Sequence, residues 1–310
     1  MKKIVLPNGL QVSEVALGAM MFGTTTPKKE AYETLDAYLD IGGNFIDTSN
    51  NYAHWAGTGD ESETLLGEWL RDRGCRDRVV LATKVGFDRH GEGAGLKKEQ
   101  IEYWVDQSLA KLGTDYIDLY YAHTDDPGTP IEETLEAFDR LVKKGKVRAL
   151  GCSNFDTWRV AEANILAEQK GLTPYTAMQQ RLTYLHPRFG MAPKYVFNEA
   201  VNRERLRFLC DKEMPLISYS CLCKGAYENP ERLPADYEGG ERLEQIRAMA
   251  AARGVNPSAL VVAWLTNLYR CPGFPRVIPL FSATKEHLLQ NLRGLEIALS
   301  DDELAAMNAI

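Results

Sequence analysis

The sequence predicts an α/β fold, a (β/α)8 TIM barrel with an N-terminal β-hairpin cap. Short runs rich in apolar and β-branched residues recur eight times, and segments with a helical period of apolar residues separate them. The connections are short, which is typical of a parallel sheet. Eight strand–helix units in 310 residues favour a closed barrel over the second choice, a doubly wound open sheet. We interpret residues 1–310 as a single domain.

The first expected element is a hairpin over residues 3–13, KIVLPNGLQVS, in which two alternating segments flank the turn signal Pro7-Asn8-Gly9. This hairpin would cap the bottom of the barrel. The expected strands follow in order: VALG (15–18), NFID (44–47), VVLA (79–82), IDLYY (117–121), VRAL (147–150), YTAM (175–178), LISY (216–219) and VIPL (277–280).

Helical segments are expected between the strands. Apolar residues share one face over residues 101–112 and again over residues 131–142. The sequence Thr129-Pro130-Ile131-Glu132 predicts a capping box with proline at the first helical position, and Gly145 marks the end of that helix. Longer excursions, roughly 180–200 and 220–241, follow the sixth and seventh strands. They lie on the side where barrel active sites are found, so they should border the substrate.

Composition narrows the classes of function. A net charge of −7 and a pI near 5.4 provide no basic stripe for nucleic acid, which favours a small-molecule partner. The N-terminus lacks a signal-peptide core and no run reaches membrane-spanning length, which predicts a cytoplasmic protein. Cysteines without a CxxC pair indicate reduced thiols, and histidines without HxxxH or HExxH spacing predict no metal. Residues 90–95 are glycine-rich but lack GxGxxG spacing, and we interpret them as a mobile loop.

Ionisable residues follow three successive predicted strands. Asp47 comes after NFI, Lys84 after VVLAT and His123 after IDLYYA, while Tyr52 lies in the loop after Asp47. Each alone has an ordinary structural explanation: a turn cap, a solvated strand end, a hydrogen-bonded core histidine and loop packing. Together they are harder to explain structurally, because strand ends converge at a barrel mouth. An isolated charge at the edge of an apolar core is also costly unless it is paired.

These four residues suit proton transfer to a carbonyl oxygen. A tyrosine hydroxyl, with an ordinary pKa of about 10, is a poor acid or base at neutral pH unless a cation such as Lys84 stabilises its phenolate. Asp47 would hold Lys84 charged and oriented, and a neutral His123 would donate a hydrogen bond to the carbonyl oxygen. Reduction also needs a hydride at carbon, which side chains cannot provide, so a nicotinamide cofactor is implied.

The same residues resemble the aldo-keto reductase superfamily, whose barrels carry an Asp, Tyr, Lys, His tetrad. Residues 44–53 are similar to its NFIDTAxxYG signature, and residues 145–155 are similar to GKIRxxGxSNF. Lys84 lies in a segment similar to xxTKxG, and His123 ends one similar to DYIDLYxxH. By this resemblance Tyr52 is the general acid/base, Lys84 and Asp47 tune it, and His123 orients the carbonyl.

The resemblance also implies contacts to the cofactor, which in this family is usually NADP(H). The implied contacts are Ser153, Asn154 and Gln179 to the carboxamide, Tyr219 stacked on the nicotinamide, Ser220, Leu222 and Gly225 along the pyrophosphate, and His287 and Asn291 on the adenosine side. His287 falls where the family often has arginine or glutamine. Without a fixed guanidinium, recognition of a 2′-phosphate weakens and depends on Lys285 or His287, so NAD(H) is the alternative cofactor.

The rim of the pocket should supply the substrate contacts, which we assign to His54, Trp55, Phe87, Asp125 and Arg188. Aromatic surface beside polar groups suits a sugar or polyol, and the same proton relay would serve reduction or oxidation. His54 and Trp55 equally suit a loop anchored by its own packing.

Two other functions are considered. The first is a lyase that uses Lys84 as a Schiff-base nucleophile, which the adjacent Asp47 disfavours by raising the pKa of the amine. The second is a non-catalytic NADP(H)-binding redox sensor, which the complete tetrad disfavours.

Overall fold

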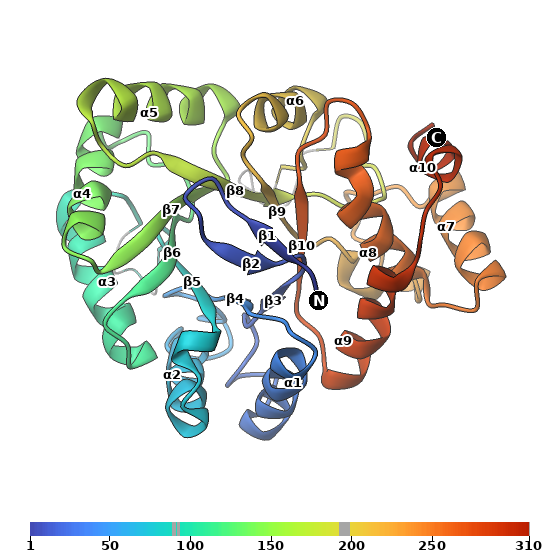
Figure 1. Ribbon diagram of the computed structural model, residues 1–310, viewed down its shortest axis with the longest axis horizontal. Coiled ribbons are helices and arrows are strands. Elements are labelled where there is room, and N and C mark those ends of the chain that lie inside the picture. The colour runs from blue at the N-terminus through green and yellow to red at the C-terminus, as the bar shows by residue number, and fades with distance from the viewer. Residues whose placement is uncertain (89–90, 92–93, 192–198, 310) are drawn as a thin grey trace.

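Parallel strands form a closed barrel in the computed structural model of the chain, which describes residues 1–88, 91, 94–191 and 199–309 (Figure 1). Around the barrel the order is β10-β3-β4-β5-β6-β7-β8-β9. The strands are β3 (Ala16–Gly18), β4 (Phe45–Asp47), β5 (Val80–Val85), β6 (Ile117–Ala122), β7 (Val147–Ser153), β8 (Tyr175–Arg181), β9 (Leu216–Tyr219) and β10 (Val277–Phe281). Each matches an expected strand, so the predicted (β/α)8 barrel is confirmed and the open sheet is excluded.

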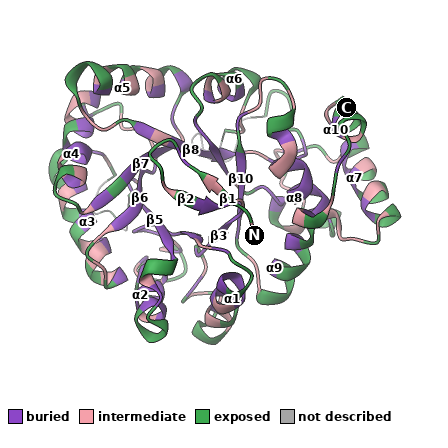
Figure 2. Cartoon of the chain, viewed as in Figure 1, coloured by how far each residue is buried: buried purple, intermediate pink, exposed green. Residues whose placement is uncertain are grey.

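Helices surround the barrel, with their apolar faces turned to the strands and their exposed faces outward (Figure 2). They are α1 (Lys28–Asp40), α2 (Glu61–Arg73), α3 (Lys98–Leu112), α4 (Ile131–Lys143), α5 (Thr157–Lys170), α6 (Arg203–Asp211), α7 (Gly240–Ala252), α8 (Pro257–Asn267), α9 (Lys285–Leu292) and α10 (Asp301–Asn308). None of these described helices is long and apolar enough to cross a membrane.

The start of α4 differs from its prediction. Pro130 is the N-cap instead of the first helical residue, and the expected capping box does not form. The Thr129 hydroxyl instead donates to Asp126 Oδ2 at 2.6 Å, because the preceding turn offers a carboxylate acceptor. Gly145 has a φ of +74°, which confirms that it ends this helical segment.

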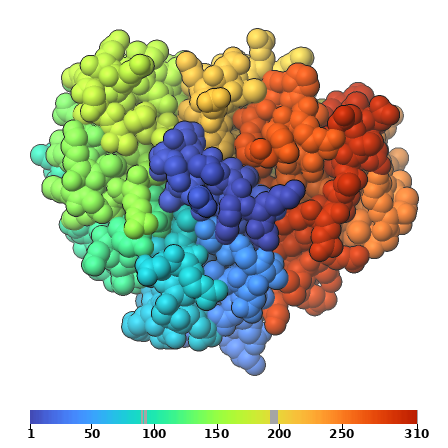
Figure 3. All heavy atoms as spheres, in the orientation of Figure 1, coloured from blue at the N-terminus to red at the C-terminus, as the bar shows by residue number. Residues whose placement is uncertain are grey.

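The N-terminal hairpin closes one end of the barrel. Its strands β1 (Lys3–Val5) and β2 (Gln11–Ser13) pair antiparallel, as predicted. Leu6 and Val12 are buried in one cluster with Ala16 and Phe45, which face the barrel interior. Figure 3 shows the hairpin lying across the centre of this face. The hairpin therefore leaves the mouth at the carboxyl ends of the strands uncovered.

The glycine-rich segment, the cysteines and the expected lack of a metal site can each be compared with the structure only over the residues that it describes. Of the glycine-rich residues 90–95, positions 90, 92 and 93 lie outside the described residues. All six cysteines are described and none forms a disulfide. In the ranges that the structure covers, no cluster of three or more His, Cys, Asp or Glu residues could hold a metal ion.

Candidate active site

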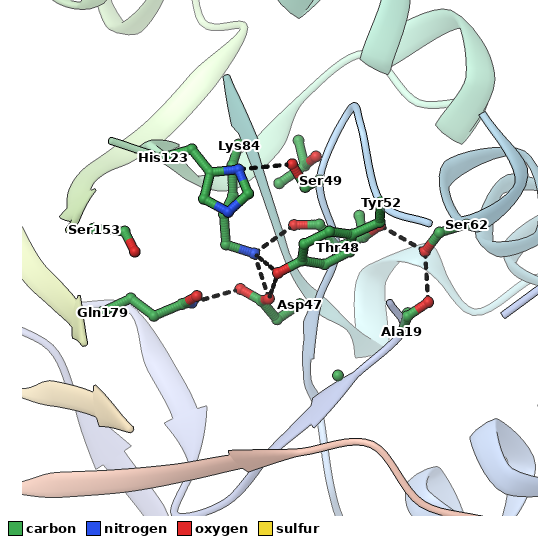
Figure 4. A network of polar contacts seen from close by, with 12 residues as sticks. Ala19, Asp47, Thr48, Ser49, Tyr52, Ser62, Lys84, His123, Ser153 and Gln179 are labelled. Carbon is green, nitrogen blue, oxygen red and sulfur yellow. Dashed lines mark hydrogen bonds and ion pairs between the residues drawn. The ribbon is translucent and has the colours of Figure 1, made fainter. Parts of the chain in front are cut away.

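Three adjacent strands deliver ionisable side chains to the barrel mouth. Asp47 is the last residue of β4, Lys84 is the penultimate residue of β5, and His123 directly follows β6. Because these parallel strands are neighbours in the barrel, their carboxyl ends adjoin (Figure 4). All three side chains are buried. Charged groups in such a place need close partners.

Lys84 is the centre of the polar contacts. Its ammonium Nζ donates to Asp47 Oδ1 at 2.5 Å, to the Thr48 carbonyl at 2.7 Å and to Tyr52 Oη at 2.6 Å. The loop after β4 turns back so that Tyr52 Oη also donates to Asp47 Oδ1, at 3.2 Å. The structure therefore brings Asp47, Tyr52 and Lys84 into mutual contact.

Burial sets the charge states of this group. Burial, and next to it the Asp47 carboxylate, raises the pKa of Tyr52 well above 10. We predicted from the sequence that Lys84 favours the phenolate, but burial and Asp47 outweigh it and the hydroxyl retains its proton. Burial also lowers the pKa of Lys84 below 10.5, and Asp47 opposes that shift. The carboxylate therefore offsets only part of the cost of burying the ammonium.

His123 completes the group. Its Nδ1 lies 3.1 Å from Ser49 Oγ, and its ring packs edge-to-face against Tyr52 and Phe87, with centroid distances of 5.8 and 4.5 Å. Burial and the Lys84 charge lower the pKa of His123 well below 6.5. The imidazole is therefore neutral at physiological pH, as the sequence argument expected.

Sequence reasoning missed the residues that fix this loop. Thr48 Oγ1 lies 2.7 Å from Ser62 Oγ, and the Ser62 hydroxyl donates to the Ala19 carbonyl at 2.7 Å (Figure 4). Ser49 positions the imidazole in the same way. The run of small polar residues after Asp47 was the available signal, because such residues commonly bond to nearby backbone and side chains.

The residues expected at the carboxamide lie beside this group. Asn154 Nδ2 donates to the His123 carbonyl at 2.9 Å and to Ser153 Oγ at 3.0 Å, and its Oδ1 accepts from Tyr219 Oη at 2.8 Å. Gln179 Nε2 donates to Asp47 Oδ2 at 2.9 Å. These hydroxyl and amide groups can both donate to and accept from a carboxamide, and the Tyr219 ring offers an aromatic face. Their chemistry fits a nicotinamide.

The segment after β9 has an unusual backbone. Positive φ angles occur at Ser220 (+51°), Cys223 (+46°), Lys224 (+56°) and Gly225 (+84°), with Leu222 buried among them. Non-glycine residues adopt this region at a cost, and such strain concentrates at ligand-binding sites. The segment follows Tyr219 directly, where the sequence predicted pyrophosphate contacts.

The two residues expected near the adenosine are on α9. His287 lies in its exposed first turn, where its backbone N–H donates to the Thr284 side chain at 3.3 Å. Asn291 is buried, and its Oδ1 accepts from Asn256 Nδ2 at 3.0 Å. That bond joins α9 to the start of α8, so Asn291 has a structural partner besides any cofactor.

The predicted rim residues have different environments. Phe87 packs on His123, so it borders the ionisable group directly. His54 Nδ1 lies 3.1 Å from the Asn51 carbonyl, and Trp55, 62% exposed, packs edge-to-face on the His54 ring at 5.3 Å. This contact matches the alternative of a loop anchored by its own packing.

The polar rim residues are held by neighbouring segments. Asp125 forms an ion pair with Arg159 at 3.3 Å, and burial raises its pKa. Arg188 Nε donates to the Tyr237 carbonyl at 3.0 Å. Through that contact the excursion after β8 packs on the excursion after β9, at the mouth where both were expected.

The mouth of this parallel barrel therefore holds buried Asp47, Lys84 and His123 beside a partly buried Tyr52, a group suited to proton transfer to a bound oxygen. The model of the aldo/keto reductase family matches residues 14–310, so the chain belongs to the aldo/keto reductase family and is an oxidoreductase.

Curated relatives agree with this family assignment. The chain is 33% identical over 323 residues to norsolorinic acid reductase stcV of Emericella nidulans. That alignment covers 96% of this chain and 77% of the relative. The chain is 32% identical over 331 residues to aldo-keto reductase ausK of the same organism, covering 97% and 79%. It is 31% identical over 337 residues to the aryl-alcohol dehydrogenase (NADP+) of Phanerodontia chrysosporium, covering 97% and 83%.

Proposed function

We propose that the protein is an NADP(H)-dependent oxidoreductase that interconverts a carbonyl and an alcohol, with Tyr52 as general acid and base. The observation that carries the proposal is the 2.6 Å contact between Tyr52 Oη and a lysine that is itself paired with Asp47. This contact provides a proton donor beside a fixed positive charge.

The proton would move as follows in reduction. Tyr52 retains its proton before reaction, because burial and Asp47 raise its pKa. A substrate carbonyl oxygen would replace Asp47 as the acceptor of the hydroxyl, and the Lys84 ammonium would stabilise the phenolate that remains. The neutral imidazole of His123 would donate to the same oxygen from Nε2, since Nδ1 faces Ser49. Oxidation of an alcohol would reverse these steps.

The cofactor would be held by Ser153, Asn154, Gln179 and Tyr219 at its nicotinamide end, and by the 220–225 segment and α9 beyond it. The chemistry that the cofactor supplies when bound is hydride transfer to or from carbon. Family membership and the NADP+-named relative favour NADP(H). NAD(H) is the alternative, because Lys285 and His287 provide less specific contacts to a 2′-phosphate than a guanidinium.

For the substrate we propose an aromatic aldehyde or aryl alcohol. Phe87 beside His123 and the exposed Trp55 provide aromatic surface, and one relative is named for aryl alcohols. A sugar or polyol, expected from the mixture of aromatic and polar rim residues, is the alternative. Asp125 and Arg188 support it less, because both are held by other partners.

The two competing functions receive less support. A Schiff-base nucleophile needs an accessible neutral amine, whereas Lys84 Nζ is buried and donates to three acceptors. Asp47 alone does not disfavour the lyase through the pKa of the amine, since burial lowers the pKa of Lys84 despite Asp47. Borohydride trapping with substrate would detect such a lyase. A redox sensor would have no need for the complete tetrad.

The test is turnover with NADPH and with NADH over aromatic aldehydes, ketones, aryl alcohols and sugars. We expect Tyr52→Phe to lower kcat at least about a hundredfold, the usual contribution of a general acid, without loss of cofactor binding. Tyr32→Phe is the matched control, because it removes the hydroxyl of a tyrosine on α1 that donates to the exposed Asp72. Undiminished activity of Tyr52→Phe would refute the proposed role.

A further inference from the structure

A second carboxyl group is buried next to the barrel wall behind Lys84. Glu63 lies in the first turn of α2, its side chain is fully buried, and its Oε1 accepts from Thr83 Oγ1 at 2.6 Å. Successive side chains of a strand point to opposite faces, so Thr83 points outward to α2 while the adjacent Lys84 points into the mouth. Glu63 therefore stands on the outer side of the wall, one residue from the central lysine.

Close packing of α2 on α3 creates this environment. Gly67 lies against the backbone of Lys111 and Leu112, where a Cβ would collide. Lys111 Nζ thereby comes within 3.7 Å of Glu63 Oε2 and forms an ion pair with Asp60, which precedes α2. Lys111 is the cation nearest Glu63 Oε2, and the Ser108 hydroxyl of α3 also stabilises this carboxylate. A carboxylate in such a place is costly to bury, so its retention requires an explanation.

We propose that Glu63 is a positioning residue for the reaction: a second buried carboxylate that acts through the barrel wall, with Asp47, to keep the Lys84 ammonium charged. This inference rests on the proposed function, in which that charge stabilises the Tyr52 phenolate. Asp47 alone is a shared partner, since Tyr52 and Gln179 also donate to it. The negative charge of Glu63 would add to the stabilisation of the Lys84 ammonium that Asp47, bonded to two other donors, provides only in part.

The charged and titratable groups around Glu63 come from four directions. Lys111 of α3 and Asp60 at the start of α2 lie on the same side of the wall as Glu63, Tyr120 of β6 is also close enough to interact, and Lys84 of β5 interacts with it electrostatically across the wall. Burial raises the pKa of Glu63 above 4.5, and Lys111 is the main group opposing that shift. For Lys84, Glu63 acts after Asp47 in opposing the lowering of the pKa by burial. The position in the first turn of a helix also favours the anion.

The experiment compares wild type with Glu63→Gln, which keeps the size of the side chain and removes its charge. Loss of a negative charge lowers the pKa of every neighbouring group. At an effective dielectric near 20, a unit charge about 12 Å away shifts a pKa by about one unit. We therefore expect the pKa of Lys84, followed by 13Cε NMR and assigned with Lys84→Met, to fall by about one unit.

The pH dependence of kcat is the second measurement. In reduction its alkaline limb should move by a similar amount to lower pH, with KM changed less than about twofold. Thr83→Val, which removes the hydrogen bond to Glu63 and keeps the shape of the side chain, should produce a smaller shift in the same direction and serves if Glu63→Gln does not fold.

Glu68→Gln is the matched control, because Glu68 lies on the same helix but is only partly buried and pairs with the exposed Lys28. This control variant should change neither the Lys84 titration curve nor the pH dependence of kcat. An unchanged Lys84 titration in Glu63→Gln would overturn the proposal, whether or not kcat falls. The NMR titration needs no turnover, so it separates failure of this inference from failure of the proposed function, which would appear as an inactive wild type.

Discussion

At the scale of single residues, Tyr52 owes its environment to three neighbours. Lys84 donates a hydrogen bond to its oxygen, Asp47 accepts a hydrogen bond from its hydroxyl, and His123 packs against its ring. Burial and Asp47 hold the proton on Tyr52, while Lys84 is in place to stabilise the anion after transfer. This combination suits an acid that must keep its proton until a substrate oxygen displaces the carboxylate.

His123 should make the stability of the protein sensitive to acid. Its pKa is lowered in the folded state, so below about pH 6.5 the unfolded chain binds a proton that the folded chain does not. Stability is therefore present above pH 6.5 and is lost as the pH falls. Between pH 7.5 and 5.5 we expect the wild type to lose about 1.4 kcal/mol more unfolding free energy than His123→Gln.

Urea unfolding at the two pH values measures this difference. Other acidic and basic groups contribute equally to both proteins. The difference between the two losses of unfolding free energy therefore reports the titration of His123 alone. Equal losses in wild type and variant would show that the imidazole titrates as it does in an unfolded chain.

At the scale of elements, α2 and α3 pack closely at Gly67. Because a Cβ on Gly67 would collide with the backbone of Lys111 and Leu112, Gly67→Ala must push the two helices apart. We expect a loss of about 1–3 kcal/mol of unfolding free energy, the usual cost of overpacking.

Urea unfolding checks this prediction, with Glu68→Ala at the next position of α2 as control. Glu68 is partly exposed and its ion pair with Lys28 lies at the surface, so its loss should cost less than about 0.5 kcal/mol. A Gly67→Ala protein as stable as wild type would mean that the two helices separate without cost.

At the scale of the whole molecule, stability and chemistry belong to opposite ends of the barrel. Leu6 and Val12 plug the end that the hairpin covers, away from Asp47 and Lys84. We expect Leu6→Ala to cost about 2–5 kcal/mol of unfolding free energy while kcat below the melting temperature stays unchanged.

Thermal unfolding and initial rates on the same samples test this separation. Val5→Ala is the control, because Val5 belongs to the same hairpin and is 63% exposed. A fall in kcat of Leu6→Ala at a temperature where it is fully folded would contradict it.

The sequence by itself determined the strands, the hairpin and the order of ionisable groups at the mouth. These features depend on local apolar periodicity and on where each strand ends, and both can be recognised along a single chain. Asp47, Lys84 and His123 could be grouped in advance because neighbouring parallel strands place their carboxyl ends together.

Only the tertiary structure decided the charge states and the supporting contacts. Glu63 meets Thr83 because α2 packs behind β5, and Lys111 joins them from α3, contacts that span 20 to 48 positions of the chain. The start of α4 was likewise decided by an acceptor, Asp126, that competes for the Thr129 hydroxyl. Burial affects the pKa values of Tyr52 and Lys84 more than their partner residues do. Desolvation depends on all the surrounding atoms that exclude water, and these cannot be identified from a sequence pattern.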